Sequence, residues 1–343
     1  MSQSVLFRDF EIWDGEQFSR GSVLVEGERI AGMGQIEAAA DTVFEGNGRL
    51  LTAGLVDIHT HFRYLSDDRY GLPAEAATFP FGVTAAVDAT GMRGDAAYMD
   101  TLTPDVGVWV EIPIRDNQPM FEVARNRAAA LGRYVVGYKV YFCGQATDAH
   151  PLDEIFRRAD RPVMVHTTGS PVPMAEYLPL FRAGDVLTHA FHGGAHTAAQ
   201  IGFSSLRTAQ ERGVVIDLGM AGHVHTDLKI LQQAAAWGLF PDTISSDAVI
   251  GSLNRRGGRY GLTLCMSVMR HLGMPRQMLM AAVTGRAAQV VGRDWGHLSV
   301  GGPADLAVLA VDDASGFDYP DLQGRAGFVC ELTMKNGVVV HRR

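Results

Sequence analysis

The chain has 343 residues, of which 47% are hydrophobic and 20% charged, and its formal net charge is −8. This length fits one large barrel with an accessory lobe or two ordinary domains, and the acidic balance argues against nucleic acid or an anionic membrane as a partner. Three scattered cysteines (Cys143, Cys265 and Cys330) exclude a disulfide framework. Because the sequence shows neither a secretory signal nor an apolar run of about 18 residues, we expect a cytoplasmic protein.

Both ends of the chain have the pattern of short strands separated by turns. Residues 4–34 and 301–343 are rich in Val, Ile, Leu and Phe, with charged or Gly-containing breaks. Asn336-Gly337 is a typical two-residue hairpin turn. Two β-rich ends around a different middle predict one small sheet domain built from both termini. The expected domains are a β-sandwich from residues 1–52 and 299–343 and a barrel from residues 53–298.

The middle of the chain alternates between apolar, strand-like runs and helix-like stretches. Eight runs qualify as strands: 51–62, 82–90, 106–114, 135–142, 161–169, 185–193, 214–221 and 242–249. The clearest helical candidates are 118–134, 150–160, 196–213, 259–272 and 276–291. Eight strand–helix units of this size predict an α/β protein with a (β/α)₈ TIM barrel. A doubly wound sheet would usually carry a Gly-rich phosphate loop after its first strand, where this chain has histidines.

Polar side chains interrupt or end several of these apolar runs. They are His59, His61, Lys139, His166, His189 and Asp247. His59 and His61 are two residues apart, so both side chains of an extended strand point the same way. Catalytic groups of such barrels lie at the carboxyl ends of the strands. We therefore expect these six side chains to converge at one mouth of the barrel, around metal ions.

Two segments at the domain boundaries carry a family resemblance. "GRLLTAGLVDIHTHF" (48–62) resembles the first barrel strand of the amidohydrolase superfamily, and "GHLSVGGPADLAVL" (296–309) resembles its return into the β-sandwich. The resemblance covers essentially the whole chain. Four further segments are most similar to the dihydroorotase-like deacetylase group: "VMVHTTGSP", "GDVLTHAFHGG", "GVVIDLGMAGH" and "FPDTISSDA".

This resemblance implies a centre with two metal ions per subunit. The implied ligands are His59, His61 and Asp247 for the more buried ion and His166 and His189 for the more exposed one. Lys139 would be carboxylated by CO₂, and its carbamate would bridge both ions. Such ligands suit Zn²⁺, with Mn²⁺, Fe²⁺ or Co²⁺ as alternatives. A hydroxide shared by two ions would attack a substrate carbonyl, and Asp247 would act as general base and then as general acid.

Arg63 completes the sequence "HTHFR" and is a candidate for substrate binding. In dihydroorotases and related enzymes, an Arg at this spacing binds a substrate carboxylate, which a guanidinium can contact at two points. The alternative is a solvated Arg, or an ion pair with Asp67 or Asp68. The presence of Arg63 favours an acidic substrate such as an N-acyl amino acid.

Three more histidines are candidates for the substrate pocket. His192 lies three residues after His189 and either faces the substrate or has a structural role. His223 and His225 follow the seventh strand and could line the pocket. The deacetylase group tends to carry a His nearer the position of Met220, which leaves the role of both open. Of these, we take His192 and His223 as substrate-binding candidates.

The function expected from these residues is hydrolysis of an amide bond in a small molecule, as in deacylation of an N-acyl amino acid. The alternatives are an esterase or lactonase acting on an acetylated hydroxy acid and a dihydroorotase-like hydrolase of cyclic amides. The resemblance also disfavours deamination, because mononuclear deaminases typically carry a Glu two or three residues after the histidine of the fifth strand, whereas no Glu follows His166 until Glu176. A non-catalytic scaffold is disfavoured because all six ligand positions are filled. Such barrels often associate, so we expect a homo-oligomer.

Overall fold

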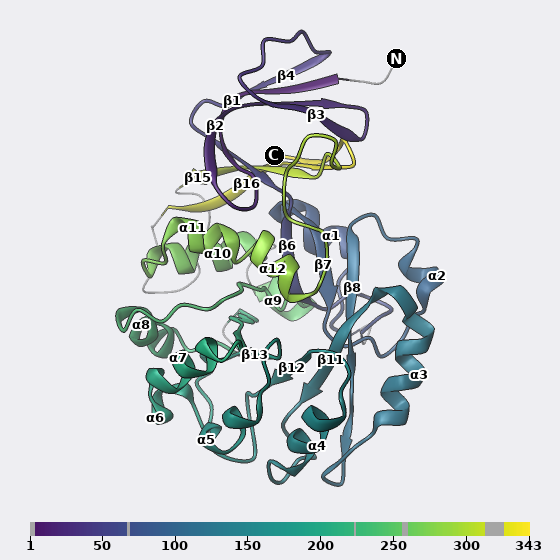
Figure 1. Ribbon diagram of the computed structural model, residues 1–343, viewed down its shortest axis with the longest axis vertical. Helices are drawn as coiled ribbons and strands as arrows, with labels where there is room; N and C mark the ends of the chain where they lie inside the picture. Colours follow the sequence, from purple (N-terminus) through teal and green to yellow (C-terminus); the bar gives the residue numbers. More distant parts are fainter. Residues whose placement is uncertain (1–3, 67–68, 223, 256–259, 313–325) are drawn as a thin grey trace.

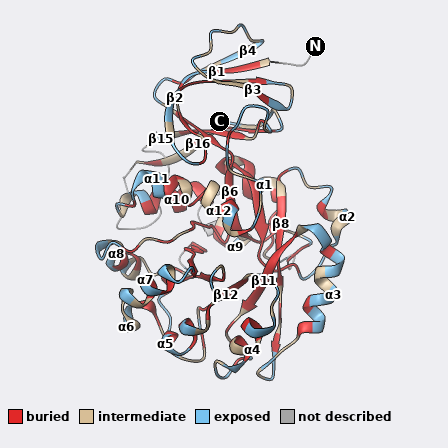
Figure 2. Ribbon diagram, in the orientation of Figure 1, coloured by how far each residue is buried: buried red, intermediate tan, exposed pale blue. Residues whose placement is uncertain are grey.

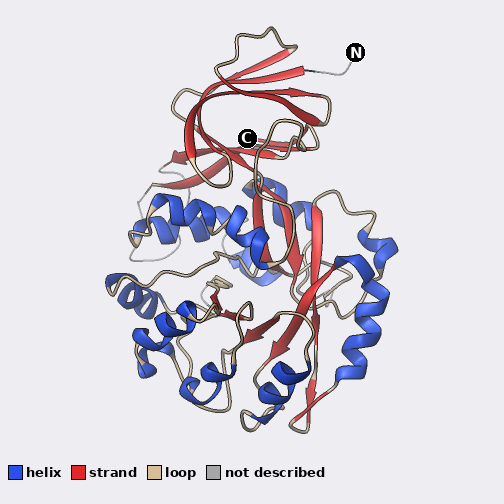
Figure 3. Ribbon diagram, viewed as in Figure 1, coloured by secondary structure: helices blue, strands red, loops and turns tan. Residues whose placement is uncertain are grey.

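The structure is a computed structural model that describes residues 4–66, 69–222, 224–255, 260–312 and 326–343. It contains a mostly antiparallel sheet at one end of the molecule and a curled parallel sheet flanked by helices at the other (Figures 1 and 3). The predicted α/β class, with one sheet assembled from both ends of the chain, is confirmed at this level.

The antiparallel sheet has the order β17-β16-β15-β5-β1-β2-β3, and β4 pairs with β1. Its strands are β1 (Ser4–Trp13), β2 (Phe18–Glu26), β3 (Arg29–Gly34), β4 (Thr42–Glu45), β5 (Leu50–Ala53), β15 (Leu306–Asp312), β16 (Gly327–Lys335) and β17 (Val338–Arg342). Strands β5 and β15 pair directly, so the two ends of the chain meet within one sheet. The turn between β16 and β17 is the predicted Asn336-Gly337 pair, with φ of 48° and 74°. Positive φ at both positions is the geometry of a tight hairpin turn.

The parallel sheet has the order β14-β13-β12-β11-β8-β7-β6. Its strands are β6 (Leu55–Thr60), β7 (Val83–Asp88), β8 (Asp105–Glu111), β11 (Val135–Tyr141), β12 (Val163–His166), β13 (Val186–Thr188) and β14 (Val215–Ile216). A separate two-stranded ribbon joins β9 (Ile114–Arg115) and β10 (Gln118–Pro119). The parallel strands are buried almost throughout (Figure 2), which explains why they read as continuous apolar runs rather than alternating ones.

The last two predicted barrel strands are much shorter or more irregular than expected. Only Val215–Ile216 of the predicted strand 214–221 is a strand, and 242–249 forms isolated bridges instead of a strand. The physical reason is backbone conformation, because Gly219, Ala221 and Asp247 have φ of 50°, 46° and 49°, outside the extended region. Parallel bridges nevertheless connect residues 243–248 to Asp217 on one side and to Thr60 on the other.

Helices follow most of the parallel strands. They are α1 (Ala74–Thr78), α2 (Ala96–Met99), α3 (Phe121–Leu131), α4 (His150–Arg158), α5 (Met174–Tyr177), α6 (Ala198–Ile201), α7 (Phe203–Glu211), α8 (Leu228–Ala236), α9 (Ile250–Arg255), α10 (Leu262–His271), α11 (Arg276–Ala281) and α12 (Gly285–Val290). The predicted helix 196–213 is divided at Gly202, whose φ of 81° ends one helix and begins the next. None of the helices in the described part of the chain has the length and apolar character needed to cross a bilayer.

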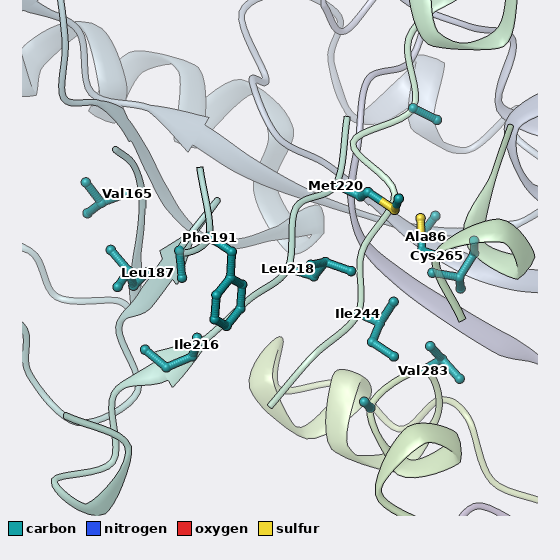
Figure 4. Close-up of a cluster of buried hydrophobic side chains, with 14 of the residues drawn as sticks. Ala86, Val165, Leu187, Phe191, Ile216, Leu218, Met220, Ile244, Cys265 and Val283 are labelled. Atoms are coloured by element: carbon teal, nitrogen blue, oxygen red, sulfur yellow. The ribbon is translucent and has the colours of Figure 1, made fainter. Parts of the chain in front are cut away.

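The interior of the parallel sheet is filled by apolar side chains from strands and helices. Figure 4 shows Leu187 and Ile216 from neighbouring strands near Phe191 and Leu218, with Ile244 and Val283 farther along the same cluster. All six are fully buried. Burial of this apolar surface is the main source of the stabilisation that places the strand ends, and with them the polar side chains at their tips.

A buried ion cluster joins the two sheets. The ammonium of Lys335, in β16, lies 2.8 Å from Asp105 at the start of β8 and 2.5 Å from Asp305 just before β15. The Lys335 side chain is only 3% exposed. Burial raises the pKa of Asp305, and the charge of Lys335 opposes that rise. The ion pair between Lys335 and Asp105 therefore connects the antiparallel sheet to the parallel sheet.

We predict that Lys335→Met lowers the free energy of unfolding by about 3 kcal/mol, because it leaves a buried carboxylate without its counter-ion. Urea denaturation at pH 7 measures the loss. The difference from the unsubstituted protein should shrink as pH falls, since protonation neutralises Asp305. Arg8→Met removes an exposed partner of Glu45 and should change stability little. Equal unfolding midpoints for the Lys335 variant and the unsubstituted protein would contradict the prediction.

Candidate metal centre

The six residues singled out in the sequence lie together at the carboxyl end of the parallel sheet. Their positions are the end of β6 for His59 and His61, β11 for Lys139, the last residue of β12 for His166, the residue after β13 for His189 and the bridging segment for Asp247. All six are buried. They converge because parallel strands present their carboxyl ends on one edge of the sheet.

The ligand atoms form two groups that adjoin at Asp247. His59, His61 and Asp247 form one group, and His166, His189 and His225 form the other, with the ligand atoms of each group within 4.8 Å of one another. One oxygen of Asp247 lies 2.9 Å from Nε2 of His61, and the other lies 3.7 Å from Nε2 of His189. The carboxylate therefore contacts both groups.

His59 is oriented by a hydroxyl and a carboxylate behind it. Thr188 donates its hydroxyl hydrogen to Asp217 at 2.7 Å, and the hydroxyl oxygen of Thr188 lies 3.1 Å from Nδ1 of His59. Because that hydrogen is committed to Asp217, Nδ1 of His59 must be the donor to Thr188. Nε2 of His59 is left with its lone pair, facing the cluster.

His61 has an equivalent support on its own Nδ1. Both Ser66 and Thr90 place a hydroxyl oxygen 3.2 Å from this nitrogen. Ser66 in turn donates to Asp88 at 3.0 Å. The Ser66 oxygen can therefore accept a hydrogen bond from Nδ1 of His61, and in that tautomer Nε2 keeps its lone pair and faces Asp247.

The two histidines of the second group are held through backbone carbonyls. Nδ1 of His189 donates to Gly219 O at 2.6 Å, and Nε2 of His166 donates to Thr168 O at 3.2 Å. Nε2 of His189 is buried and has no hydrogen-bond partner among the described residues. A buried imidazole nitrogen without a partner is costly. A cation at this position would satisfy it.

Gly219 is required for this arrangement. A Cβ on Gly219 would lie 2.3 Å from the Thr188 hydroxyl and 2.5 Å from Nδ1 of His189. His189 and Asp247 themselves have φ of 59° and 49°. Left-handed backbone at two non-glycine residues costs energy, and such strain is concentrated at functional sites.

Lys139 lies beside the first group. Its Nζ is 3.2 Å from Nε2 of His59, and the side chain is fully buried. Burial lowers the pKa of Lys139 to about 8, against the opposing effect of the carboxylates of Asp247 and Asp217. A larger fraction of neutral amine is therefore available than for an ordinary lysine.

Charge states in the cluster suit a cation. Burial lowers the pKa of His59 to about 4 and holds the pKa values of His166 and His189 well below the usual range, so these rings are neutral at pH 7. Burial alone would raise the pKa of Asp247, but the neighbouring imidazoles outweigh it and hold that pKa well below its ordinary value. Neutral imidazoles with an ionised carboxylate form a donor set that fits Zn²⁺ or a similar divalent ion.

A cavity of about 320 Å³ opens over both groups. Besides the ligand candidates, its wall consists of Tyr70, Tyr141, Ala221, Gly222, Val224, Val249, Gly251 and Ser252. The space is at the small end of the range for ligand pockets. It is therefore suited to a small molecule whose reacting group lies against the imidazoles.

The predicted substrate-binding residues are not among the residues that line this cavity. Arg63 is half-buried, and its carbonyl accepts a hydrogen bond from Tyr98. His192 is fully buried, its Nδ1 accepts a hydrogen bond from the Gly194 N–H at 3.3 Å, and burial lowers its pKa to about 4. His223, like Asp67 and Asp68, lies outside the described residues.

Two residues of the site, Tyr141 and Asp217, were not predicted from the sequence. Tyr141 is two residues after Lys139 on the same strand, so the alternation of side chains could have placed it in the cavity. Asp217 interrupts the apolar run "VVIDLG" in the same way as the predicted ligands interrupt theirs. His225 was considered for the pocket, but nothing in the sequence distinguished it from His223.

Comparison with known proteins gives the following likenesses. No family model matches the chain. A deacetylase of Agrobacterium fabrum is 27% identical over 338 residues, covering 88% of this chain and 81% of that protein. The crystal structure of a dihydroorotase has a TM-score of 0.84 at 24% identity and covers 98% of each chain. The crystal structure of an adenine deaminase has a TM-score of 0.79 at 20% identity, covering 99% of this chain and 100% of that one. The two structural likenesses concern the fold.

We predict that Thr188→Val weakens binding of a cation to the first group by about 10–100-fold, as loss of a hydrogen bond behind a metal ligand typically does. Valine keeps the shape of threonine but leaves Nδ1 of His59 without an acceptor. Titration of metal-free protein with Zn²⁺ against a competing chelator measures the affinity. Thr188→Ser retains the hydroxyl and should bind as the unsubstituted protein does; equal loss in both variants would argue against the hydrogen bond as the cause.

Proposed function

Because this chain belongs to the amidohydrolase superfamily, in its dihydroorotase-like branch, and is a hydrolytic enzyme, we propose that it removes an acyl group from a small amide with the help of two divalent cations. The observation that carries the proposal is the pair of adjoining ligand groups beneath one small cavity. The likeness to a deacetylase over most of both chains supports the reaction class. We also propose that residues 243–248 complete an eight-stranded barrel within residues 53–298, and that residues 1–52 and 299–343 form the sandwich domain.

The proposed ligands are those predicted from the sequence. His59, His61 and Asp247 would hold the first ion, and His166 and His189 the second. Zn²⁺ fits this donor set best, with Mn²⁺, Fe²⁺ or Co²⁺ as alternatives. Lys139 would react with CO₂ through its neutral amine, forming an N–C bond and releasing a proton. The resulting carbamate places an anionic group where an ammonium could not ligate a cation.

The chemical role of the protein's own groups follows from their placement. When bound, paired divalent ions lower the pKa of water and polarise a carbonyl. Asp247 is ionised and faces both ligand groups, so it can accept a proton from the attacking water and deliver it to the leaving nitrogen. The walls formed by Tyr70, Tyr141 and Val249 narrow the space around the reacting carbonyl.

The substrate that we favour is an N-acyl amino acid or a similar small carboxylate-bearing amide. The size of the cavity and the deacetylase relative support a small acyl group, while the carboxylate rests on the resemblance at Arg63. His192 and His223 remain predicted substrate-binding residues, because His192 lies at the end of the sixth predicted barrel strand and His223 follows the seventh. Hydrolysis of an ester is the second candidate, because the same site could attack either carbonyl. The proposal includes a cytoplasmic location and a homo-oligomer.

A substrate screen tests the function. We predict that protein loaded with Zn²⁺ in the presence of bicarbonate hydrolyses N-acetyl or N-formyl amino acids, and that removal of the metal with a chelator abolishes turnover. Acetyl esters and cyclic amides form the comparison set. Turnover that persists at full rate after verified metal removal would refute the proposal.

Arg63→Ala should raise KM for acidic amides more than for neutral ones.

We predict that Asp247→Asn lowers kcat by about 10²–10⁴-fold, the usual contribution of a general acid or base. The amide keeps the shape of the side chain but cannot accept the proton. Steady-state kinetics and metal content should be measured on the same preparation, because loss of an ion would by itself remove activity. Asp294→Asn, at a side chain that is 98% exposed, is the matched control. Near-normal turnover in the Asp247 variant would remove this residue from the role.

A further inference from the structure

His225 lies beside the second ligand group although it comes from a different part of the chain. It follows β14 and precedes Asp227, the residue that caps α8 by accepting hydrogen bonds from Lys229 N and Ile230 N. The backbone N–H of Asp227 also donates to Phe191 O at 2.9 Å. These bonds hold the segment against the loop that follows β13, and so they fix the distance between His225 and His189.

The three rings of the second group are packed against one another. The ring centroid of His225 lies 4.4 Å from that of His189 and 4.8 Å from that of His166. His166 and His189 are 4.6 Å apart. His225 is half-buried and lines the cavity, so it stands at the boundary between the buried pair and the substrate space.

Thr168 connects two of these rings. Its carbonyl accepts a hydrogen bond from Nε2 of His166, and its hydroxyl oxygen lies 3.1 Å from Nδ1 of His225. When that hydroxyl accepts from Nδ1–H, the lone pair of His225 is on Nε2. Each ring of the group then has one nitrogen occupied by the protein and one nitrogen free, as in metal sites where hydrogen bonds set the tautomer of the ligand.

We infer that His225 is a third imidazole ligand of the second cation, in addition to His166 and His189. The inference rests on the proposed function, because it assigns a further ligand within that centre. Two nitrogens bound to one tetrahedral Zn²⁺ ion would be about 3.4 Å apart, and the ligand atoms of this group lie within 4.8 Å of one another. A movement of less than about 1 Å per ring would bring all three into coordination, which is comparable to the ordinary displacement of side chains.

The competing role for His225 is contact with the substrate alone. That role would need only one free nitrogen of His225 facing the cavity. It would not require ring nitrogens of His166, His189 and His225 to converge on one point. The unpartnered, buried Nε2 of His189 favours a cation at the common point of the three rings. Three neutral imidazoles would also bind the second cation without relying wholly on an anionic group at Lys139.

The test is metal binding by the 343-residue chain, measured apart from activity. Metal-free protein and His225→Asn are titrated with Zn²⁺, and bound metal is measured after dialysis. Two ions per chain are expected for the unsubstituted protein and about one for the variant at the same free Zn²⁺. With Co²⁺ in place of Zn²⁺, the visible absorption bands of the second ion should be lost or shifted. His150→Asn, at a largely exposed histidine, is the matched control.

A second pair of variants separates positioning from misfolding. Thr168→Val removes the hydroxyl next to His225 but keeps the backbone carbonyl. This variant should bind the second ion about 10–100-fold more weakly. Thr168→Ser should bind it normally. If the unsubstituted protein binds two ions and His225→Asn binds both with unchanged affinity, the inference is wrong and the proposed function stands. If the unsubstituted protein binds no ion, both are wrong.

Discussion

Every histidine at the mouth of the parallel sheet has two ring nitrogens, and the protein occupies one of them. Nδ1 of His59 donates to Thr188, and Nδ1 of His189 donates to Gly219 O. The remaining nitrogens converge because these acceptors are themselves fixed, on β13 and in the segment after β14. A ring free to rotate would spread its lone pair over many directions. The hydrogen bonds behind the rings therefore set how tightly the cluster can hold a cation.

The same hydrogen bonds connect the site to the fold. Asp217 accepts from the hydroxyls of Thr188, Thr243 and Ser245. Two of these hydroxyls belong to the irregular segment 243–248, whose backbone also forms hydrogen bonds with residues 216–221 and with His59. The buried carboxylate thus fastens the segment that carries Asp247 to the strand that supports His59. A buried polar group that is fully hydrogen-bonded can specify one arrangement of the surrounding chain in this way.

Much of this centre could be predicted because its residues break the local pattern. A lysine or histidine inside an apolar run is conspicuous, as at Lys139 and His166, and the end of a strand in such a sheet is a known location for chemistry. His225 could not be ranked in the same way. It lies in an irregular segment with no periodicity, and its importance depends on contacts with Thr168 and His189, which are distant in the sequence.

The sequence by itself determined the strand–helix alternation, the sheet built from both ends and the six conspicuous polar positions, because these follow from hydrophobic periodicity within short windows. Only the tertiary structure decided which nitrogen of each ring faces the cluster, that Arg63 and His192 do not line the cavity, and that 242–249 makes bridges instead of a strand. Those outcomes depend on packing between segments far apart in the chain and on positive φ at single residues such as Asp247. Local composition carries no record of either.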